Sequence, residues 1–149
     1  LQVATAESCT GGGIAEAITR IDGSSAWFGQ GWVTYSNAAK VAQLGVPRML
    51  LDAHGAVSRE VVVAMAEGAR QRADADWAVA VSGIAGPDGG SAEKPVGTVW
   101  LAWAGRDETH AQCRLFTGDR AQVREQTVVL ALEELIKWVC HSELGNHVP

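Results

Sequence analysis

The segment at residues 77–82, WAVAVS, limits the fold of this chain more than any other. A continuous apolar run is typical of a strand buried on both faces, in a sheet that helices cover on both sides. Strand and helix patterns alternate through the first two-thirds of the chain, and a polar turn at residues 106–108 joins two later strands. We therefore predict one α/β domain over residues 1–149, with three α/β/α layers and a mixed sheet.

Hydrophobic periodicity assigns the other elements. We predict strands at residues 1–6, 27–35, 77–82, 97–104 and 111–116. We predict helices at residues 10–20, 37–44, 58–73 and 119–140, and a short helix after Pro47. A long loop rich in glycine and proline occupies residues 83–95. Because the sequence begins directly on a strand, we expect that a preceding segment is missing from it.

Composition argues against several classes of function. A net charge of −5 argues against a general nucleic-acid-binding surface. No apolar run approaches the length of a membrane span, so we expect no membrane partner. The three cysteines, Cys9, Cys113 and Cys140, are widely spaced and odd in number. They indicate a reducing compartment, the cytoplasm, rather than a disulfide framework, and the histidines lack metal-ligand spacing.

The stretch AESCTGGG, residues 6–13, stands where the first predicted strand meets the first predicted helix. It presents a carboxylate, hydroxyls, a thiol and glycines: Glu7, Ser8, Cys9, Thr10, Gly11, Gly12 and Gly13. Free amides and the helix dipole at such a junction favour a bound anion and would lower the pKa of a nearby thiol. The alternative is structural, with Ser8 or Thr10 as an N-cap and the glycines as a tight turn.

Two further stretches offer polar groups at strand ends. In VTYSNAAK, Tyr35 ends a predicted strand and Lys40 lies about one turn into the next helix. A desolvated lysine can activate a serine, with a tyrosine as bridge, but by themselves these residues more often indicate a solvated lysine and a packed tyrosine. In SGIAGPDGG, Ser82 ends the buried strand, so Ser8 and Ser82 can face one cleft. The alternative is a glycine-rich surface loop.

Two cations follow that loop. Lys94, in EKPVGTV, either closes the loop over an anionic ligand or is simply exposed. Arg120, in FTGDR, lies in the first turn of the last helix, where a cation is slightly unfavourable. Arg120 would therefore bind either an anionic ligand or a carboxylate of the protein.

Seven stretches in this order resemble the CinA C-terminal domain family: ATAESCTGG, GSSAWF, GWVTYSNAAK, GAVSREVV, SGIAGPDGG, KPVGTVW and GDR. The resemblance runs from the first residues through the last helix, and we expect the amino-terminal helix usual in the family to be missing from this sequence. It implies hydrolysis of nicotinamide mononucleotide to nicotinic acid mononucleotide and ammonia, in pyridine-nucleotide salvage. It implies no metal and no organic cofactor.

The resemblance also implies roles for individual residues. Ser8 corresponds to the family's nucleophile, and Tyr35 and Lys40 to the residues that assist it. Further site positions correspond to Ser25, Ser82 and Arg120, and less securely to Lys94 and Arg124.

These roles combine into one expected mechanism. Neutral Lys40, either directly or through Tyr35, takes the proton of Ser8, which attacks the carboxamide carbon. Amides at Cys9 to Gly12, or at Gly83, hold the oxyanion. Arg120 or Lys94 takes the phosphate, and Glu7 either lies near the cationic pyridinium or orients Lys40.

Two other readings stay open at this point. One is a non-catalytic module that binds a nucleotide or a competence-related partner in the same cleft. The other is an enzyme acting on a different amide, or one using the thiol of Cys9, since a thiolate is the better nucleophile near neutral pH. We also expect a homodimer, because residues 27–32 leave an apolar edge that needs cover.

Overall fold

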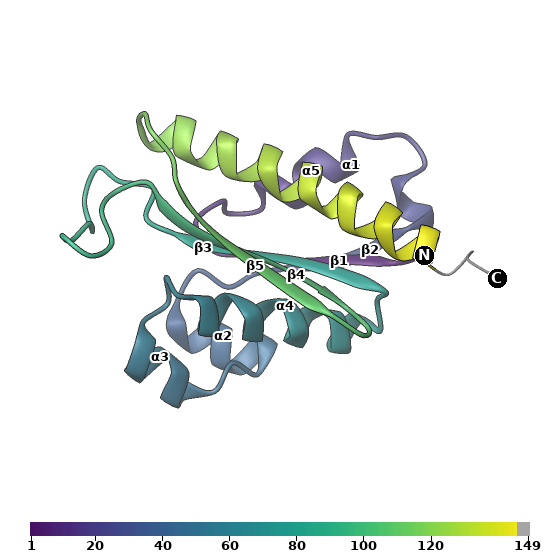
Figure 1. Ribbon diagram of the computed structural model, residues 1–149, viewed down its shortest axis with the longest axis horizontal. Helices are drawn as coiled ribbons and strands as arrows, with labels where there is room; N and C mark the ends of the chain where they lie inside the picture. The colour runs from purple at the N-terminus through teal and green to yellow at the C-terminus, as the bar shows by residue number, and fades with distance from the viewer. Residues whose placement is uncertain (146–149) are drawn as a thin grey trace.

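A computed structural model describes residues 1–145 of the chain (Figure 1). The strands are β1 Val3–Glu7, β2 Phe28–Val33, β3 Trp77–Gly83, β4 Thr98–Gly105 and β5 Thr109–Leu115. The helices are α1 Gly13–Thr19, α2 Asn37–Leu44, α3 Arg48–His54, α4 Arg59–Ala73 and α5 Arg120–Gly145, with a short 3-10 helix η1 at Ser24–Ala26.

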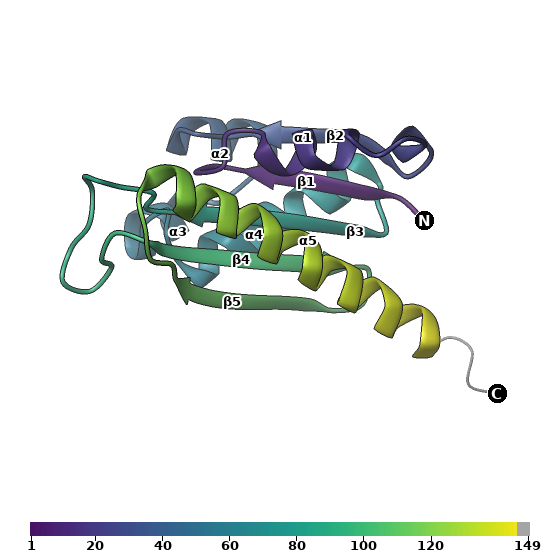
Figure 2. The same cartoon turned by 90° about the horizontal axis from the view of Figure 1, so that it is seen from above.

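The strands form one mixed sheet in the order β2-β1-β3-β4-β5, which Figure 2 shows from above. β1 pairs in parallel with β2 and β3, whereas β3, β4 and β5 pair antiparallel. The apolar run at residues 77–82 lies in β3 at the centre of the sheet and is buried throughout. The predicted mixed sheet is therefore confirmed.

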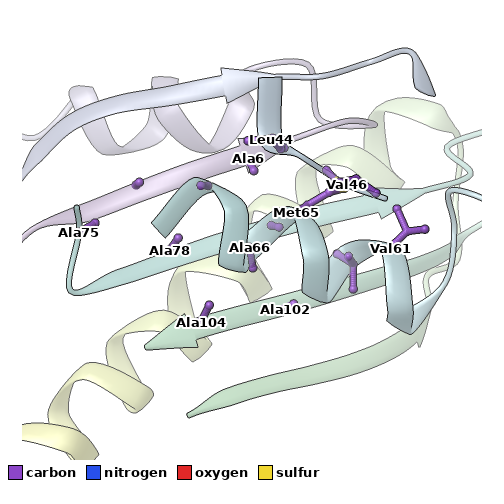
Figure 3. Close-up of a cluster of buried hydrophobic side chains, with 14 of the residues drawn as sticks. Ala6, Leu44, Val46, Val61, Met65, Ala66, Ala75, Ala78, Ala102 and Ala104 are labelled. Atoms are coloured by element: carbon purple, nitrogen blue, oxygen red, sulfur yellow. The ribbon is translucent and has the colours of Figure 1, made fainter. Parts of the chain in front are cut away.

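Helices cover both faces of this sheet, which confirms the three layers. α1 and α5 lie on one face, and α2, α3 and α4 on the other (Figure 1). On the α4 face the strands present mainly alanines, so the helix packs close to the sheet (Figure 3). The close packing continues between helices, because a Cβ on Gly68 of α4 would lie 2.1 Å from the main-chain oxygen of Leu44 in α2.

The opposite face carries larger side chains. Val79, Leu101 and Trp103 of the sheet pack with Ile14 of α1 and Val123 of α5. The Trp103 indole Nε1 donates a hydrogen bond of 2.9 Å to the Ala131 oxygen. This bond ties α5 across the sheet and leaves the start of α5 near the ends of the strands that carry the polar motifs.

Several predicted boundaries need correction. α1 begins at Gly13 rather than at residue 10, because Gly11 and Gly12 adopt positive φ angles of 58° and 100° that a right-handed helix excludes. β2 ends at Val33 rather than at residue 35. α5 continues to Gly145, five residues beyond the predicted end at residue 140.

Two kinds of feature are not found in the described residues. None of the helices there combines the length and the apolar character that crossing a membrane requires. No group of three or more histidine, cysteine, aspartate or glutamate side chains in that part of the chain is placed to hold a metal ion.

Candidate active site

The carboxyl ends of β1 and β3 define the candidate site. These strands are parallel neighbours with Glu7 opposite Val81, so the next residues, Ser8 and Ser82, come to the same edge of the sheet. The Ser8 N–H donates to the Val81 oxygen at 3.2 Å, which extends the ladder by one residue. Both serines are largely buried. The predicted meeting of the two serine-bearing loops is therefore found.

Lys40 reaches this edge from α2. Ser36 caps the helix by accepting a hydrogen bond of 3.0 Å from the Ala39 N–H, and Lys40 follows within the first turn. Its side chain points inward and is only 1% exposed. The Lys40 Nζ lies 3.1 Å from the Ser8 Oγ and donates to the Thr34 oxygen at 2.7 Å. The structure thus joins two residues that are 32 positions apart in the sequence.

The surroundings of Lys40 favour its neutral form. Burial lowers the pKa of the Lys40 amine below its ordinary value of 10.5. Among the described residues, no carboxylate forms an ion pair with this amine to offset that effect. A neutral amine can donate its two N–H groups to the Thr34 and Tyr35 oxygens while its lone pair faces the Ser8 hydroxyl.

Tyr35 does not take the expected bridging position. The Lys40 Nζ contacts Ser8 directly, and only the main-chain oxygen of Tyr35 lies near it, at 3.4 Å. The Tyr35 ring is 61% exposed, and its hydroxyl accepts a hydrogen bond of 3.0 Å from Arg120. The expectation that Tyr35 relays the proton from Ser8 to Lys40 is therefore corrected, because the two groups already touch.

Arg120 connects this hydroxyl to the glycine-rich loop. Its guanidinium donates to the Gly86 oxygen at 2.9 Å as well as to Tyr35, so the first residue of α5 holds two walls of the cleft together. Figure 2 shows the loop between β3 and β4 projecting beyond the sheet at the end where β1 stops. The cleft is lined by Ser8, Cys9, Tyr35, Asn37, Lys40, Ala56, Val57, Ser82, Gly83, Ile84, Ala85, Gly86, Asp88, Gly89 and Arg120.

Eight lining residues were not predicted as site residues: Asn37, Ala56, Val57, Ile84, Ala85, Gly86, Asp88 and Gly89. All eight belong to stretches that carried the family resemblance, but no spacing or residue type marked them individually. Asn37 follows the N-cap of α2, and Ala56 and Val57 precede α4. Their place in the cleft depends on how α2 and α4 pack on the sheet.

Glu7 fills the amino end of α1 that was expected to bind an anion. Its carboxylate is fully buried and accepts hydrogen bonds from the Ile14 N–H at 2.8 Å and the Ala15 N–H at 3.1 Å. The Thr10 hydroxyl also donates to it. The anion at this helix terminus is thus part of the chain, and Thr10, Gly11 and Gly12 do not line the cleft. Glu7 itself contacts neither the cleft nor Lys40.

Cys9 lines the cleft but lacks the properties of a reactive thiol. Burial raises the pKa of the Cys9 thiol to about 11, and the charge of Glu7 adds to the rise. The expectation of a lowered thiol pKa is corrected, since the Glu7 carboxylate neutralises the field of α1 and the thiol is 5% exposed. Near neutral pH the thiol is protonated.

Three other residues carried over from the resemblance lie outside the lining of the cleft. Arg124 supports the turn after Ser8 from behind, donating to the Cys9 and Thr10 oxygens at 3.1 Å each. Lys94 donates to the His54 oxygen at 2.8 Å and so fastens the long loop to the end of α3.

Ser25 is the third of these residues, and the sheet topology separates it from the cleft. It lies in η1, just before β2 begins, and is exposed. Because β1 and β2 are parallel, a residue preceding β2 and a residue following β1 stand at opposite ends of the sheet. Within one chain, Ser25 therefore does not reach Ser8.

Replacing the buried Glu7 carboxylate tests its structural role. We expect Glu7→Gln to lower the free energy of unfolding by roughly 1–3 kcal/mol, because an amide cannot accept as many bonds from the start of α1. Glu16→Gln is the matched control, since Glu16 is an exposed residue of the same helix. Urea unfolding measures both variants, and equal stability of Glu7→Gln and the unchanged chain would contradict the assignment.

The fold and the site define the class of this protein. It is a three-layer α/β domain with a buried serine–lysine pair at the carboxyl edge of its parallel strands. A family model, the CinA C-terminal domain, matches residues 1–139, and the chain belongs to this family.

Similar proteins agree with that membership. Nicotinamide-nucleotide amidohydrolase PncC of Pseudomonas putida is 63% identical over 136 residues, which cover 91% of this chain and 85% of that protein. The protein of the same name from Escherichia coli K12 is 59% identical, covering 89% and 81%.

Solved structures show the same fold. The competence damage-inducible protein A of Klebsiella pneumoniae superposes with a TM-score of 0.91 at 41% identity, covering 94% of this chain and 87% of that one. The competence/damage inducible protein of Agrobacterium tumefaciens gives a TM-score of 0.89 at 52% identity, covering 92% and 84%. The family resemblance stated from the motifs is confirmed.

Proposed function

We propose that this chain hydrolyses the carboxamide of nicotinamide mononucleotide to nicotinic acid mononucleotide and ammonia. The observation that carries the proposal is the 3.1 Å contact between the Ser8 Oγ and the buried Lys40 Nζ. A serine beside a neutral amine is a recognised arrangement for nucleophilic attack on an amide without histidine. The substrate comes from the relatives, which are named nicotinamide-nucleotide amidohydrolases.

The first half of the reaction forms an acyl-enzyme. Lys40 accepts the Ser8 hydroxyl proton as the Ser8 Oγ bonds to the carboxamide carbon, and the carbonyl oxygen takes the negative charge. Breaking the carbon–nitrogen bond then releases ammonia, with the proton returned from Lys40. In the second half, water attacks the ester, Lys40 takes the water proton, and the Ser8 Oγ leaves and is reprotonated.

The oxyanion needs donors close to Ser8, and two amides of the cleft lining qualify. The Ile84 N–H points to β4, where it donates to the Thr98 oxygen at 2.9 Å. Amides alternate in direction along a strand, so the preceding Gly83 N–H points toward Ser8. Within the described residues, neither the Gly83 N–H nor the Cys9 N–H donates to another main-chain oxygen outside regular elements. We assign the oxyanion to these two amides.

The phosphate is assigned to Arg120. Among the described residues that line the cleft, its guanidinium is the exposed cation, whereas Lys40 is buried and Lys94 lies outside the lining. A planar guanidinium suits phosphate oxygens. The former candidates Thr10, Gly11 and Gly12 are withdrawn from this role because Glu7 already fills that helix terminus.

The proposed reaction also bears on the pathway and the compartment in which the protein acts. Nicotinic acid mononucleotide as product places the step in pyridine-nucleotide salvage. The three cysteines are all free thiols, as a reducing cytoplasm would keep them. The homodimer stays a prediction, resting on β2 as an edge strand of the sheet.

An ammonia-release assay tests the function. We expect turnover of nicotinamide mononucleotide, with the riboside roughly ten- to a hundred-fold poorer in kcat/KM because it lacks the phosphate that Arg120 binds. Free nicotinamide should be poorer still. If correctly folded protein binds the nucleotide but releases no ammonia from any of the three, the non-catalytic module is the better account.

A further inference from the structure

Asp88 is the one carboxylate among the described residues that line the cleft. It stands in the glycine-rich loop between β3 and β4, two residues beyond Gly86, whose oxygen Arg120 holds at 2.9 Å. The other acidic residue considered for the pyridinium, Glu7, is fully buried and bonded to α1. Among the described residues, Asp88 is therefore the carboxylate placed to face a ligand in this cleft.

The Asp88 side chain is free to meet a ligand. It is exposed, and among the described residues it forms no ion pair. The loop around it is nevertheless fastened, by Arg120 on one side and by the Lys94–His54 hydrogen bond of 2.8 Å on the other. An unpaired carboxylate on a fastened loop presents a fixed negative charge to the cleft.

The rest of the lining suits a flat cation beside that charge. Tyr35 presents a ring that is 61% exposed, and the face of an aromatic ring attracts cations. Arg120 repels a positive ring, so a substrate that carries both a cationic ring and a phosphate needs a carboxylate for the former as well as a guanidinium for the latter. Asp88 and Arg120 supply these two opposite charges in one cleft.

We propose that Asp88 is a specificity-determining residue that selects a positively charged ring bearing the carboxamide over a neutral ring of the same shape. The proposal rests on the proposed function and adds to it that the site recognises the positive charge of the substrate ring. It predicts that the pyridinium of nicotinamide mononucleotide contributes to binding through Asp88, independently of the phosphate.

The test compares two ligands that differ only in ring charge. Nicotinamide mononucleotide carries the cationic ring, and benzamide riboside 5′-phosphate replaces the ring nitrogen by carbon and is neutral there. Dissociation constants are measured by calorimetry in a Ser8→Ala background, which prevents turnover. Asp88→Asn is combined with that background, and Glu93→Gln is the matched control, because Glu93 is an exposed acid of the same loop outside the cleft lining.

We expect Asp88→Asn to reduce the preference for the cationic ligand about five-fold, the size expected for a partly solvated ion pair, and added salt to weaken the preference of the parent. Glu93→Gln should leave the preference unchanged. In the background that retains Ser8, Asp88→Asn should raise KM for the mononucleotide with little change in kcat.

Two results would overturn the proposal. One is an equal loss of affinity for both ligands in Asp88→Asn, which would mean that Asp88 only shapes the loop. The other is a parent protein that does not prefer the cation. Both are distinguishable from failure of the proposed function, because that failure appears as the absence of ammonia release by the protein with Ser8 and Asp88 intact.

Discussion

Ser8→Ala abolishes ammonia release from nicotinamide mononucleotide, with a loss in kcat of at least about a thousand-fold, whereas Cys9→Ala keeps much of the activity. This is the largest effect we expect. Ser8 is the hydroxyl that Lys40 contacts at 3.1 Å, and no other group in the described cleft can form the acyl-enzyme as directly. The Cys9 thiol, with its pKa raised to about 11, stays protonated near neutral pH.

The measurement is continuous ammonia release at saturating mononucleotide for both variants. Circular dichroism provides the control that both are folded. The reverse pattern, with Cys9→Ala inactive and Ser8→Ala active, would replace the serine mechanism by a thiol mechanism. Trapping with hydroxylamine adds a check on the covalent step, because an acyl-enzyme, whether an ester or a thioester, yields a hydroxamate, and the Ser8→Ala and Cys9→Ala variants then tell the two apart.

Lys40→Met removes most of the activity at neutral pH, again by about a thousand-fold, because Ser8 loses the base that contacts it. Methionine keeps the length and apolar stem of the side chain, so the buried site stays filled. Lys40→Arg should not restore activity, since a guanidinium remains charged and cannot accept the proton. Activity of Lys40→Met close to that of the unchanged protein would exclude Lys40 as the base.

The pH dependence follows from the direction of the Lys40 shift. Burial lowers the pKa of Lys40 below 10.5, and the neutral amine is the active form. The value of kcat/KM should therefore rise with pH and level off once the pH exceeds that lowered pKa. In Lys40→Met the residual rate should lose this rise.

The same shift links Lys40 to stability. With a folded pKa below the unfolded one, the unfolded chain binds more protons, so stability increases with pH across the interval between the two values. Below that interval the amine is charged in both states and its charge is buried at a cost, whereas within the interval folding requires the amine to lose its proton. Lys40→Met should thus be more stable than the unchanged protein at neutral pH, and the difference should shrink as the pH approaches 10.5. Urea unfolding at several pH values measures this.

Most of the secondary structure could be predicted because its signals are local. The apolar run at residues 77–82 identified the central strand. The helices predicted at residues 37–44 and 58–73 match α2 and α4 to within one residue, and the structure shows Ser36 and Ser58 as their N-caps. The start of α1 was predicted three residues early, since the apolar pattern does not reveal that Gly11 and Gly12 take positive φ angles. The end of α5 was predicted at residue 140, whereas the helix continues to Gly145.

The chemistry of the site was only partly predictable. Ser8, Lys40, Ser82 and Arg120 do meet in one cleft, and the order of parallel strands explains why. The motif could not show that Tyr35 leaves Lys40 in direct contact with Ser8, nor that Ser25 stands at the other end of the sheet. Those facts depend on strand direction and on the side of the sheet that each helix covers.

The carboxylates of Glu7 and Asp88 show most clearly which properties the sequence determines and which depend on tertiary structure. The residue pattern alone is enough to predict the layers, the mixed sheet and the polar groups at the strand ends. Tertiary packing decides the role of each acid. The Glu7 carboxylate accepts hydrogen bonds from the start of α1, whereas Asp88 lines the cleft and forms no ion pair among the described residues. Burial, charge pairing and pKa depend on neighbours that lie far away along the chain, so they are properties of the folded molecule and not of any single motif.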